Sequence, residues 1–428
     1  MRYLIESYGC QMNIAESNAL ELILKGRGFE KTEDSSKADA VIINTCSVRK
    51  TAENRIWGRL GYFNAIKRKR DLRIIVTGCM AERMKEELKK EAPYIDLVVG
   101  TNDKSEIPDF LEGSRIVHQD SYSFLGSYYQ EGEFSSYVPI MNGCNNFCSY
   151  CIVPYVRGRE VSRSVEDIIK EIRFLESKGV REITLLGQNV NSYHQVYQGR
   201  DVDFPELLSI ITGLMENIIF VRFESPHPKD FSDRLIEEIR RNERVAKHIH
   251  LPMQSGSTRI LKLMNRKNTR EDFISLIDRM RTIEGLTFAT DVMTGFPSET
   301  EEEYEETLSL MEYMGCTEAF MYYFNPREGT RAFDMPDQIP DDVKIRRLER
   351  LIEEQLERQS RIKKGLLPYK ARVIVQGRSR DDESMYLSRG EHNDFIVFPA
   401  IREHKAGDVV FVEARELSGN TFKGAEIV

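Results

Sequence analysis

Short apolar runs alternate with helical patterns along most of this 428-residue chain. In the first part, strands are expected at Arg2–Ser7, Ala40–Asn44, Arg73–Thr77 and Leu97–Val99, and helices at Glu16–Lys25, Thr51–Ile66 and near Ala81–Lys90. Strands that alternate with helices are typical of a parallel sheet covered by helices. The pattern therefore predicts an N-terminal Rossmann-like α/β domain.

Three cysteines of this part, Cys10, Cys46 and Cys79, each lie just past the end of a predicted strand. Ligands of open α/β sheets gather beyond the carboxyl ends of the strands, so three strands are expected to bring three thiols to one edge. Gly9 and Gly78 permit the tight turns that are needed there. The alternative is three unrelated buried cysteines, a common environment for this residue. The repeated placement favours a shared iron–sulfur cluster with three protein ligands.

A second group, Cys144, Cys148 and Cys151, is spaced by three and two residues. Three thiolates this close cannot all pair as disulfides, but they can hold one metal centre. Cysteine runs of similar density hold iron–sulfur clusters, and three ligands leave one iron of a cubane cluster open to a small molecule. A structural zinc site is the alternative, but zinc requires a fourth protein ligand. The nearest histidines, His118 and His194, have no finger-like spacing.

The central region repeats the strand–helix alternation from residue 135 to about residue 335. The predicted strands are Val138–Met141, Ile183–Leu186, Ile218–Phe223, His248–Leu251, Thr287–Val292 and Ala319–Phe324. Six such units predict a partial TIM-like (β/α)6 barrel, in which the active site lies at the carboxyl ends of the strands. Polar motifs follow several of these strands, on the same rim as Cys144; they begin at Gly187, Glu224, Gln254 and Thr294.

The tail has a different pattern. A long charged helix is expected over Asp341–Lys364, followed by strands at Lys370–Gln376, Ser384–Leu387, Asp394–Phe398, Val409–Glu413 and Thr421–Ile427. Glycines punctuate these strands, which predicts a small OB-like β-barrel. We therefore expect domains over residues 1–117, 130–364 and 365–428.

Composition narrows the setting of the protein. The net charge of −8 does not resemble a protein dominated by nonspecific nucleic-acid binding. Two basic stretches, Lys67–Arg73 and Arg346–Lys364, have solvated helix faces as their ordinary explanation. No run is apolar enough to span a bilayer, and the N-terminus does not resemble a signal peptide. With seven cysteines, an odd number, a reducing cytoplasm is the expected location. Cys316 has no partner motif and is expected to be a core thiol.

The segment from Cys144 to Cys151, with Tyr150 before the last cysteine, resembles the cysteine motif of radical S-adenosylmethionine (SAM) enzymes. Almost the whole chain resembles their methylthiotransferase family, and specifically its tRNA-modifying MiaB branch. The matching stretches are Ser7–Asn13, Asn44–Arg49, Gly78–Arg83, Val153–Glu160, Leu185–Tyr193 and His250–Ser257. One departure is Ser298, where the family usually has glycine.

The resemblance implies three parts: an N-terminal cluster domain, a radical SAM domain and a C-terminal TRAM domain. It assigns Cys144, Cys148 and Cys151 to a 4Fe-4S cluster that binds SAM. It assigns a second, sulfur-carrying 4Fe-4S cluster to the three N-terminal cysteines, Cys10, Cys46 and Cys79.

The resemblance also implies contacts with SAM: Tyr150 near the adenine, Gly187 and Gln188 near the amino group, and Glu224 and Ser225 near the ribose. Helix capping is the ordinary alternative for such polar groups at strand ends. No catalytic residue is predicted beyond the clusters. The two arginines of the Val153–Glu160 stretch, Arg157 and Arg159, have three possible partners: a substrate phosphate, the SAM carboxylate or neighbouring acids.

The implied reaction adds a methylthio group to carbon 2 of the N6-prenylated adenosine beside the anticodon, with SAM as methyl donor and radical source. The implied partners are a tRNA anticodon stem-loop, an electron donor such as flavodoxin or ferredoxin, and a sulfur source. An unpaired loop base suits an enzyme that must splay out its target.

Three other functions compete with this interpretation. Sister branches act on a threonylcarbamoyl-adenosine of tRNA or on a ribosomal-protein aspartate, and a non-catalytic iron–sulfur carrier would also need cysteines. Gln11–Asn13 and Pro154–Glu160 favour the prenyl-adenosine branch. The barrel and its polar rim argue against a carrier, because a carrier needs no SAM pocket.

Overall fold

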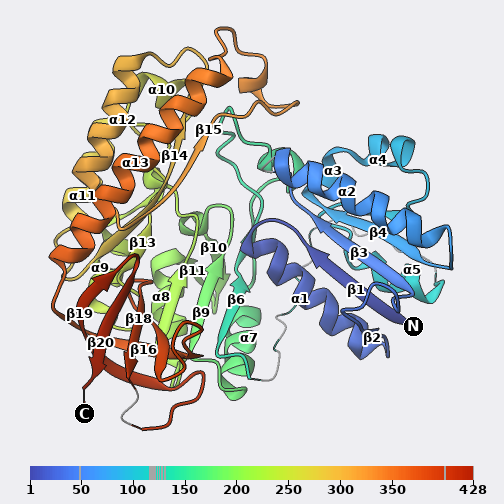
Figure 1. The fold of residues 1–428 in the computed structure, drawn as a ribbon, viewed down its shortest axis with the longest axis horizontal. Coiled ribbons are helices and arrows are strands. Elements are labelled where there is room, and N and C mark those ends of the chain that lie inside the picture. The colour runs from blue at the N-terminus through green and yellow to red at the C-terminus, as the bar shows by residue number, and fades with distance from the viewer. Residues whose placement is uncertain are drawn as a thin grey trace.

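The computed structural model describes residues 1–47, 50–114, 132–399 and 402–427, together with residues 122, 124, 126 and 129. An N-terminal α/β part, a central open barrel and a C-terminal closed β-barrel follow one another along the chain (Figure 1). The predicted mixed α/β class is confirmed. The predicted domain boundaries at 117 and 130 lie outside the described residues, and the boundary at 364 falls at the end of helix α13 (Asp341–Gly365).

The N-terminal part is a five-stranded parallel sheet with the order β2-β1-β3-β4-β5. Its strands are β1 (Arg2–Ser7), β2 (Glu30–Lys31), β3 (Ala40–Thr45), β4 (Arg73–Gly78) and β5 (Leu97–Val98), and its helices are α1 (Gln11–Gly26), α2 (Lys50–Lys67), α3 (Cys79–Arg83), α4 (Lys85–Glu91) and α5 (Glu106–Glu112). The central strand β3 is buried along its whole length, as expected where helices cover both faces. The helix predicted near 81–90 is two helices, which meet at Met84.

The central part contains the six predicted strands as two three-stranded parallel sheets, ordered β12-β9-β6 and β13-β14-β15. A parallel bridge between Val221 and Val245 connects the two sheets into one open barrel. The strands are β6 (Ser135–Pro139), β9 (Glu182–Leu186), β12 (Phe220–Phe223), β13 (His248–His250), β14 (Thr287–Thr294) and β15 (Glu318–Tyr323).

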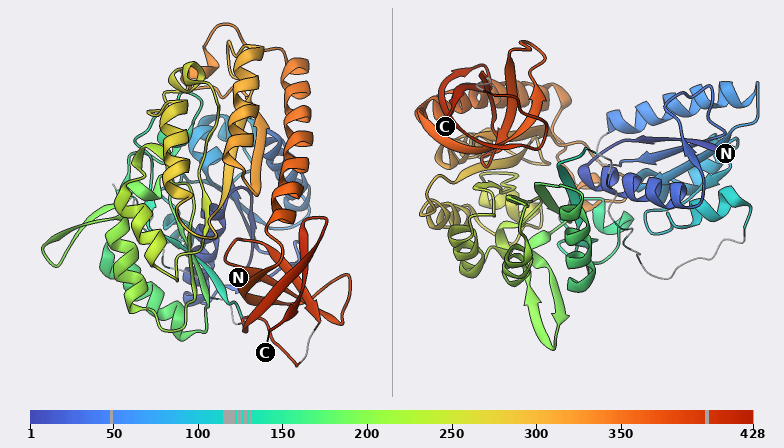
Figure 2. Two further views of the ribbon diagram at one scale, coloured as in Figure 1. Left: turned by 90° about the vertical axis from the view of Figure 1, so that its left-hand side faces the viewer. Right: turned by 90° about the horizontal axis from the view of Figure 1, so that it is seen from below.

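Helices cover the outer face of this barrel (Figure 2). They are α7 (Val165–Ser177), α8 (Phe204–Leu214), α9 (Asp233–Arg241), α11 (Arg270–Met280), α12 (Glu301–Met314) and the shorter α10 (Thr258–Leu263). The short helix α6 (Val153–Val156) instead contacts α3 of the N-terminal part. Ser164 caps α7, since its hydroxyl accepts a hydrogen bond from the Asp167 amide at 3.2 Å.

A protruding hairpin, β10 (His194–Tyr197) and β11 (Arg200–Asp203), was not expected from the sequence (Figure 2). Its turn residues, Gln198 and Gly199, both have positive φ. Gln-Gly is a weaker hairpin signal than the usual Asn-Gly or Asp-Gly. A further short pair, β7 (Met141–Asn142) and β8 (Val161–Ser162), flanks the central cysteines.

The C-terminal part is a closed barrel of five strands, β16 (Tyr369–Arg378), β17 (Met385–Gly390), β18 (Phe395–Pro399), β19 (Val409–Ser418) and β20 (Thr421–Glu426). The turn after β17 docks on the amino ends of the central strands. Arg222 links the two parts: its Nε donates to Glu182 at 2.7 Å and its Nη2 to the Gly390 carbonyl at 2.6 Å. Asn393 also donates to Glu318 at 3.1 Å.

The two basic stretches are largely committed to contacts within the chain. Lys67 pairs with Asp96, and Arg70 donates to the carbonyls of Ala38 and Ser35. Three arginines of α13 pair with carboxylates of α12 or of the loop that leads into α12. The pairs are Arg347 with Glu299, Arg350 with Glu305 and Arg358 with Glu312. Within the described parts of the chain, no helix has both the length and the apolar character required to cross a membrane.

Replacement of Arg222 by methionine is expected to lower the free energy of unfolding by about 3 kcal/mol, because buried Glu182 then loses its main partner. Chemical denaturation measures this loss. The matched control is Arg234→Met, since Arg234 pairs with Asp203 while 63% exposed, and such pairs contribute at most about 1 kcal/mol. Equal losses of unfolding free energy in the two variants would contradict the importance of the Arg222–Glu182 contact.

Candidate functional site

The three N-terminal cysteines lie at one edge of the N-terminal sheet, as predicted. Cys10 precedes α1, Cys46 directly follows β3 and Cys79 begins α3, and the strands before them are neighbours that point the same way. Gly9 shows how closely their loops approach: a Cβ on Gly9 would lie 3.0 Å from Cys46 Sγ. Cys10 is exposed, whereas Cys46 and Cys79 are buried.

Asparagines hold these loops together. Asn13 donates from Nδ2 to the carbonyls of Tyr8 at 2.8 Å and Thr45 at 3.0 Å. Asn44 donates in return to the Asn13 carbonyl at 2.9 Å, and Thr45 Oγ1 donates to the Thr77 carbonyl at 2.5 Å. One network thus spans the ends of β1, β3 and β4. The sequence motifs contain these residues, but motif matching did not assign them this role.

The central cysteines lie on a loop that begins after β7. The Cys144 amide donates to the Gly158 carbonyl at 3.1 Å, and the Cys151 amide to the Cys148 carbonyl at 3.0 Å. Arg159 lies over the Phe147 ring, with its guanidinium 4.4 Å from the ring centre. This aromatic partner from the cysteine loop is not among those considered for Arg159 from the sequence.

Burial strongly affects the central thiols. It raises the pKa of Cys144 to about 11 and, with the nearby Cys148, that of Cys151 to about 12. Both are therefore protonated at neutral pH in the protein alone. Since thiolates are the metal-binding form, cluster assembly must release their protons.

The donors at both cysteine groups are of the type that holds an iron–sulfur cluster, and both clusters stay predictions. Each group supplies three thiols from loops with glycines at close approaches, such as Gly78, where a Cβ would lie 2.4 Å from the Thr45 carbonyl. Among the described residues, no three side chains of the metal-ligating types converge tightly enough to hold one ion. A cubane cluster takes its thiolates at separate corners, so it does not require such convergence.

The two groups lie on either side of one short segment of the central part. Cys79 packs against Ile152 and Val156, which closely follow Cys151. Thr101 of the N-terminal part donates to the Val156 carbonyl at 2.6 Å. The structure therefore places the two predicted cluster sites next to the same inter-domain contact.

Two residues predicted to contact SAM lie against the Cys144 loop. Gln188 Oε1 accepts a hydrogen bond from the Gly143 amide at 2.6 Å. Gly187 packs closely on Met141, whose Cγ would lie 2.4 Å from a Cβ at position 187. These contacts support the cysteine loop, and a role in SAM binding stays a prediction.

The other predicted SAM contacts are more dispersed. Tyr150 packs against a hydrophobic cluster that includes Met264 and Phe296, and burial raises its pKa. Ser225 has the left-handed φ of 60°. Glu224 lies 3.3 Å from His250 Nδ1, on the neighbouring strand. The contacts of Tyr150, Glu224 and Ser225 with SAM stay predictions.

Sequence reasoning missed three charged residues of the barrel interior. His250 lies between Glu224 and Asp291, with its Nε2 3.1 Å from the Asp291 carboxylate. Burial alone would lower the pKa of His250, but the nearby carboxylates of Asp291 and Glu224 raise it to about 10. Arg266 is buried beside Cys148 and Tyr150 and donates to the Pro252 carbonyl at 2.7 Å. His250 belonged to a matching stretch, but nothing in the sequence showed its partners.

Comparisons with known proteins agree with this arrangement. Residues 2–100 match the family described as "Uncharacterized protein family UPF0004", and residues 138–311 match the Radical SAM superfamily. The chain is 45% identical over 447 aligned residues to the tRNA-2-methylthio-N(6)-dimethylallyladenosine synthase of Treponema denticola, with 99% of both chains covered. It is 42% identical to the protein of that name from Phocaeicola vulgatus, with 99% of this chain and 95% of the relative covered.

Solved structures show a similar fold at low sequence identity. The radical S-adenosylmethionine methyltransferase TsrM from Kitasatospora setae, solved with cobalamin and a [4Fe-4S] cluster, matches with a TM-score of 0.58 and 14% identity. The match covers 78% of this chain and 77% of that one. The cobalamin-dependent radical enzyme OxsB matches with a TM-score of 0.52 and 12% identity, covering 82% of this chain and 56% of that one.

Gly143→Ala is expected to disrupt the central cysteine loop. A positive φ costs a residue with a Cβ about 1–2 kcal/mol, and here the Cβ would also lie 2.0 Å from the Arg159 carbonyl oxygen. Denaturation and iron content after anaerobic reconstitution should both show a loss. Gly179→Ala is the control, because Gly179 also has positive φ but no atom within 4 Å of the added Cβ. Similar iron loss in both variants would show that the close approach of Gly143 to the Arg159 carbonyl is not the cause.

His250 predicts a pH dependence of stability. Its pKa of about 10 in the folded protein exceeds the unfolded value of about 6.5. The stabilisation is therefore fully present below about pH 6.5 and is lost as the pH rises towards 10. The Tm difference between the wild type and His250→Gln should shrink over this range. His194→Gln, on a side chain 64% exposed, should show no such trend, and a constant difference for His250→Gln would contradict the assignment.

Proposed function

Because the chain belongs to the family of tRNA-2-methylthio-N(6)-dimethylallyladenosine synthases, within the radical SAM superfamily, we propose that it adds a methylthio group to carbon 2 of the N6-prenylated adenosine beside the anticodon of tRNA. The enzyme class is that of a radical SAM transferase. Full-length similarity to relatives of this name is the observation that carries the proposal.

We assign one 4Fe-4S cluster, with SAM on its open iron, to Cys144, Cys148 and Cys151. The second 4Fe-4S cluster is assigned to Cys10, Cys46 and Cys79. When bound, these groups supply an organic radical, a methyl group and sulfur. The placement of both cysteine groups at strand ends, beside one inter-domain contact, supports this assignment. A radical is required because an aromatic C–H bond is not readily broken by a base or a nucleophile.

The chain's own residues prepare the site. Gln188 holds the Gly143 amide and so orients the loop that carries the central cysteines. Tyr150 and the apolar residues around it exclude water from one side of that loop. His250 keeps a proton between Glu224 and Asp291 in the barrel interior. The substrate base reaches this interior as an unpaired loop base, which can leave its stack at small cost.

The proposed reaction needs partners beyond the chain. They are the tRNA anticodon stem-loop, an electron donor such as flavodoxin or ferredoxin, and a source of sulfur. A reducing cytoplasm suits an enzyme with two oxygen-sensitive clusters.

The test uses anaerobically reconstituted protein with SAM, a strong reductant, sulfide and a prenylated anticodon stem-loop. Mass spectrometry of the digested RNA should show a methylthio group on the prenylated adenosine. Cys10→Ala should abolish this product while 5′-deoxyadenosine is still released, because only the second cluster is lost. Cys144→Ala should abolish both products. Cys316→Ala is the control, since that buried thiol lies outside both groups.

Two results would change the proposal. Release of 5′-deoxyadenosine without RNA product would retain the radical chemistry and direct the search to threonylcarbamoyl-adenosine or a ribosomal-protein aspartate. Normal product from Cys10→Ala would remove the sulfur role from the N-terminal cysteines.

A further inference from the structure

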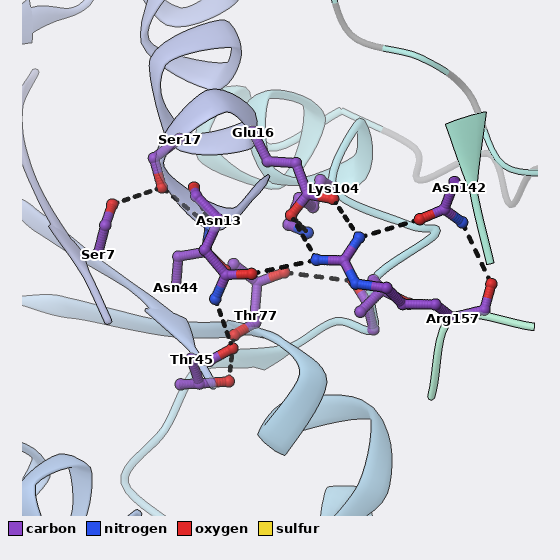
Figure 3. Close-up of polar contacts among 12 residues, drawn as sticks. Ser7, Asn13, Glu16, Ser17, Asn44, Thr45, Thr77, Lys104, Asn142 and Arg157 are labelled. Carbon is purple, nitrogen blue, oxygen red and sulfur yellow. Dashed lines mark hydrogen bonds and ion pairs between the residues drawn. The ribbon is translucent and has the colours of Figure 1, made fainter. Parts of the chain in front are cut away.

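Arg157 is a buried arginine that connects the two cysteine-bearing parts of the chain (Figure 3). It belongs to the central part, yet its guanidinium donates to Glu16 Oε1 at 2.7 Å and to Asn13 Oδ1 at 3.1 Å, both on α1 of the N-terminal part. It also donates to Asn142 Oδ1 at 2.9 Å. Of the partners considered from the sequence, a neighbouring acid is therefore the one observed, together with two amide side chains that were not considered.

These contacts form a short polar path from one cysteine group to the other. On the N-terminal side, Asn13 also holds the carbonyl of Thr45, the residue before Cys46. On the central side, Asn142 lies two residues before Cys144 and donates from Nδ2 to the Arg157 carbonyl at 3.2 Å. Arg157 is thus one amide side chain away from each cysteine loop.

The charges in this contact do not balance among its described members. Glu16 is the shared carboxylate of two cations, since Lys104 Nζ donates to its Oε2 at 2.6 Å while Arg157 donates to both of its oxygens. All three side chains are at most 4% exposed. Surplus charge in such an environment is costly unless it has a partner. Cys79 and Cys10 are close enough to interact electrostatically with Arg157, and three thiolates holding a cluster would supply negative charge there.

We propose that Arg157 is a positioning residue that sets the separation of the two iron–sulfur clusters and, together with Lys104, supplies positive charge beside the N-terminal one. This inference rests on the proposed function, because it presupposes both clusters. Its importance comes from geometry: one substrate base must reach both clusters, and a misplacement of about 1 Å can cost about 100-fold in rate.

The test of position compares Arg157→Gln and Arg157→Lys with the wild type. Lysine keeps the charge but cannot bind Glu16, Asn13 and Asn142 together as the planar guanidinium does. Both variants should change the magnetic coupling between the two reduced clusters in pulsed electron paramagnetic resonance. Both should lower methylthiolation by about 100-fold, with 5′-deoxyadenosine release retained.

The test of charge uses the midpoint potential of the N-terminal cluster, measured with Cys144, Cys148 and Cys151 replaced by alanine. Removal of positive charge in Arg157→Gln and Lys104→Met should shift the potential to more negative values, because the reduced cluster carries more negative charge. Glu16→Gln should shift it in the opposite direction. If Arg157→Gln does not fold, two other results still test the inference. They are opposite shifts of the midpoint potential in Lys104→Met and Glu16→Gln, and a changed cluster coupling in Arg157→Lys.

Arg222→Gln is the matched control, since Arg222 is an equally buried arginine paired with a glutamate at the other end of the barrel. It should change neither the coupling nor the potential. Unchanged coupling and potential in the Arg157 variants, with both clusters present, would overturn the inference alone. Absence of the N-terminal cluster from the wild-type protein, seen as missing iron and missing signal, would instead overturn the proposed function.

Discussion

The buried ion pair between Glu16 and Arg157 is the interaction on which the arrangement of this protein depends. Burial by itself would raise the pKa of Glu16, but Arg157 and Lys104 outweigh it and lower that pKa to about 2. The carboxylate therefore stays ionised at neutral pH. Separation of the two parts would leave Glu16 paired with Lys104 alone, and it would leave Arg157 without its carboxylate, which is costly for a charge that stays buried. Docking of the two parts is thus coupled to the satisfaction of these charges.

Backbone geometry adds a second constraint near the cysteines. Gly9, Gly78 and Gly143 all have positive φ, and at each of them a Cβ would meet a neighbouring atom at 2.6 Å or less. The loops approach one another closely because these side chains are absent. The asparagine network then fixes the loops through backbone carbonyls, and Asn13 Oδ1 also accepts a hydrogen bond from Cys10 Sγ at 4.0 Å.

The C-terminal barrel is fastened at the end of the central barrel opposite the cysteines. Glu182 and Glu318 begin their strands, and both bind groups of the C-terminal turn or of Arg222. Active sites of such barrels lie at the carboxyl ends of the strands. The docking contacts therefore do not occupy the carboxyl ends of the strands, where the cysteine loop, Gln188 and the inter-domain contact lie.

The sequence by itself determined the parallel strands, the closed C-terminal barrel and the position of Cys10, Cys46, Cys79 and Cys144 just after strands, because strand periodicity and turn residues are local properties. It did not determine the hairpin β10–β11, the division of the helix near 81–90, or the pairing of the basic stretches with acids. The predicted contacts of Tyr150, Glu224 and Ser225 with SAM stay predictions. Only the tertiary structure decided the partners of Arg157 and His250, since Arg157 and Glu16 are 141 residues apart and side chains so distant are brought together by packing, which no local pattern encodes.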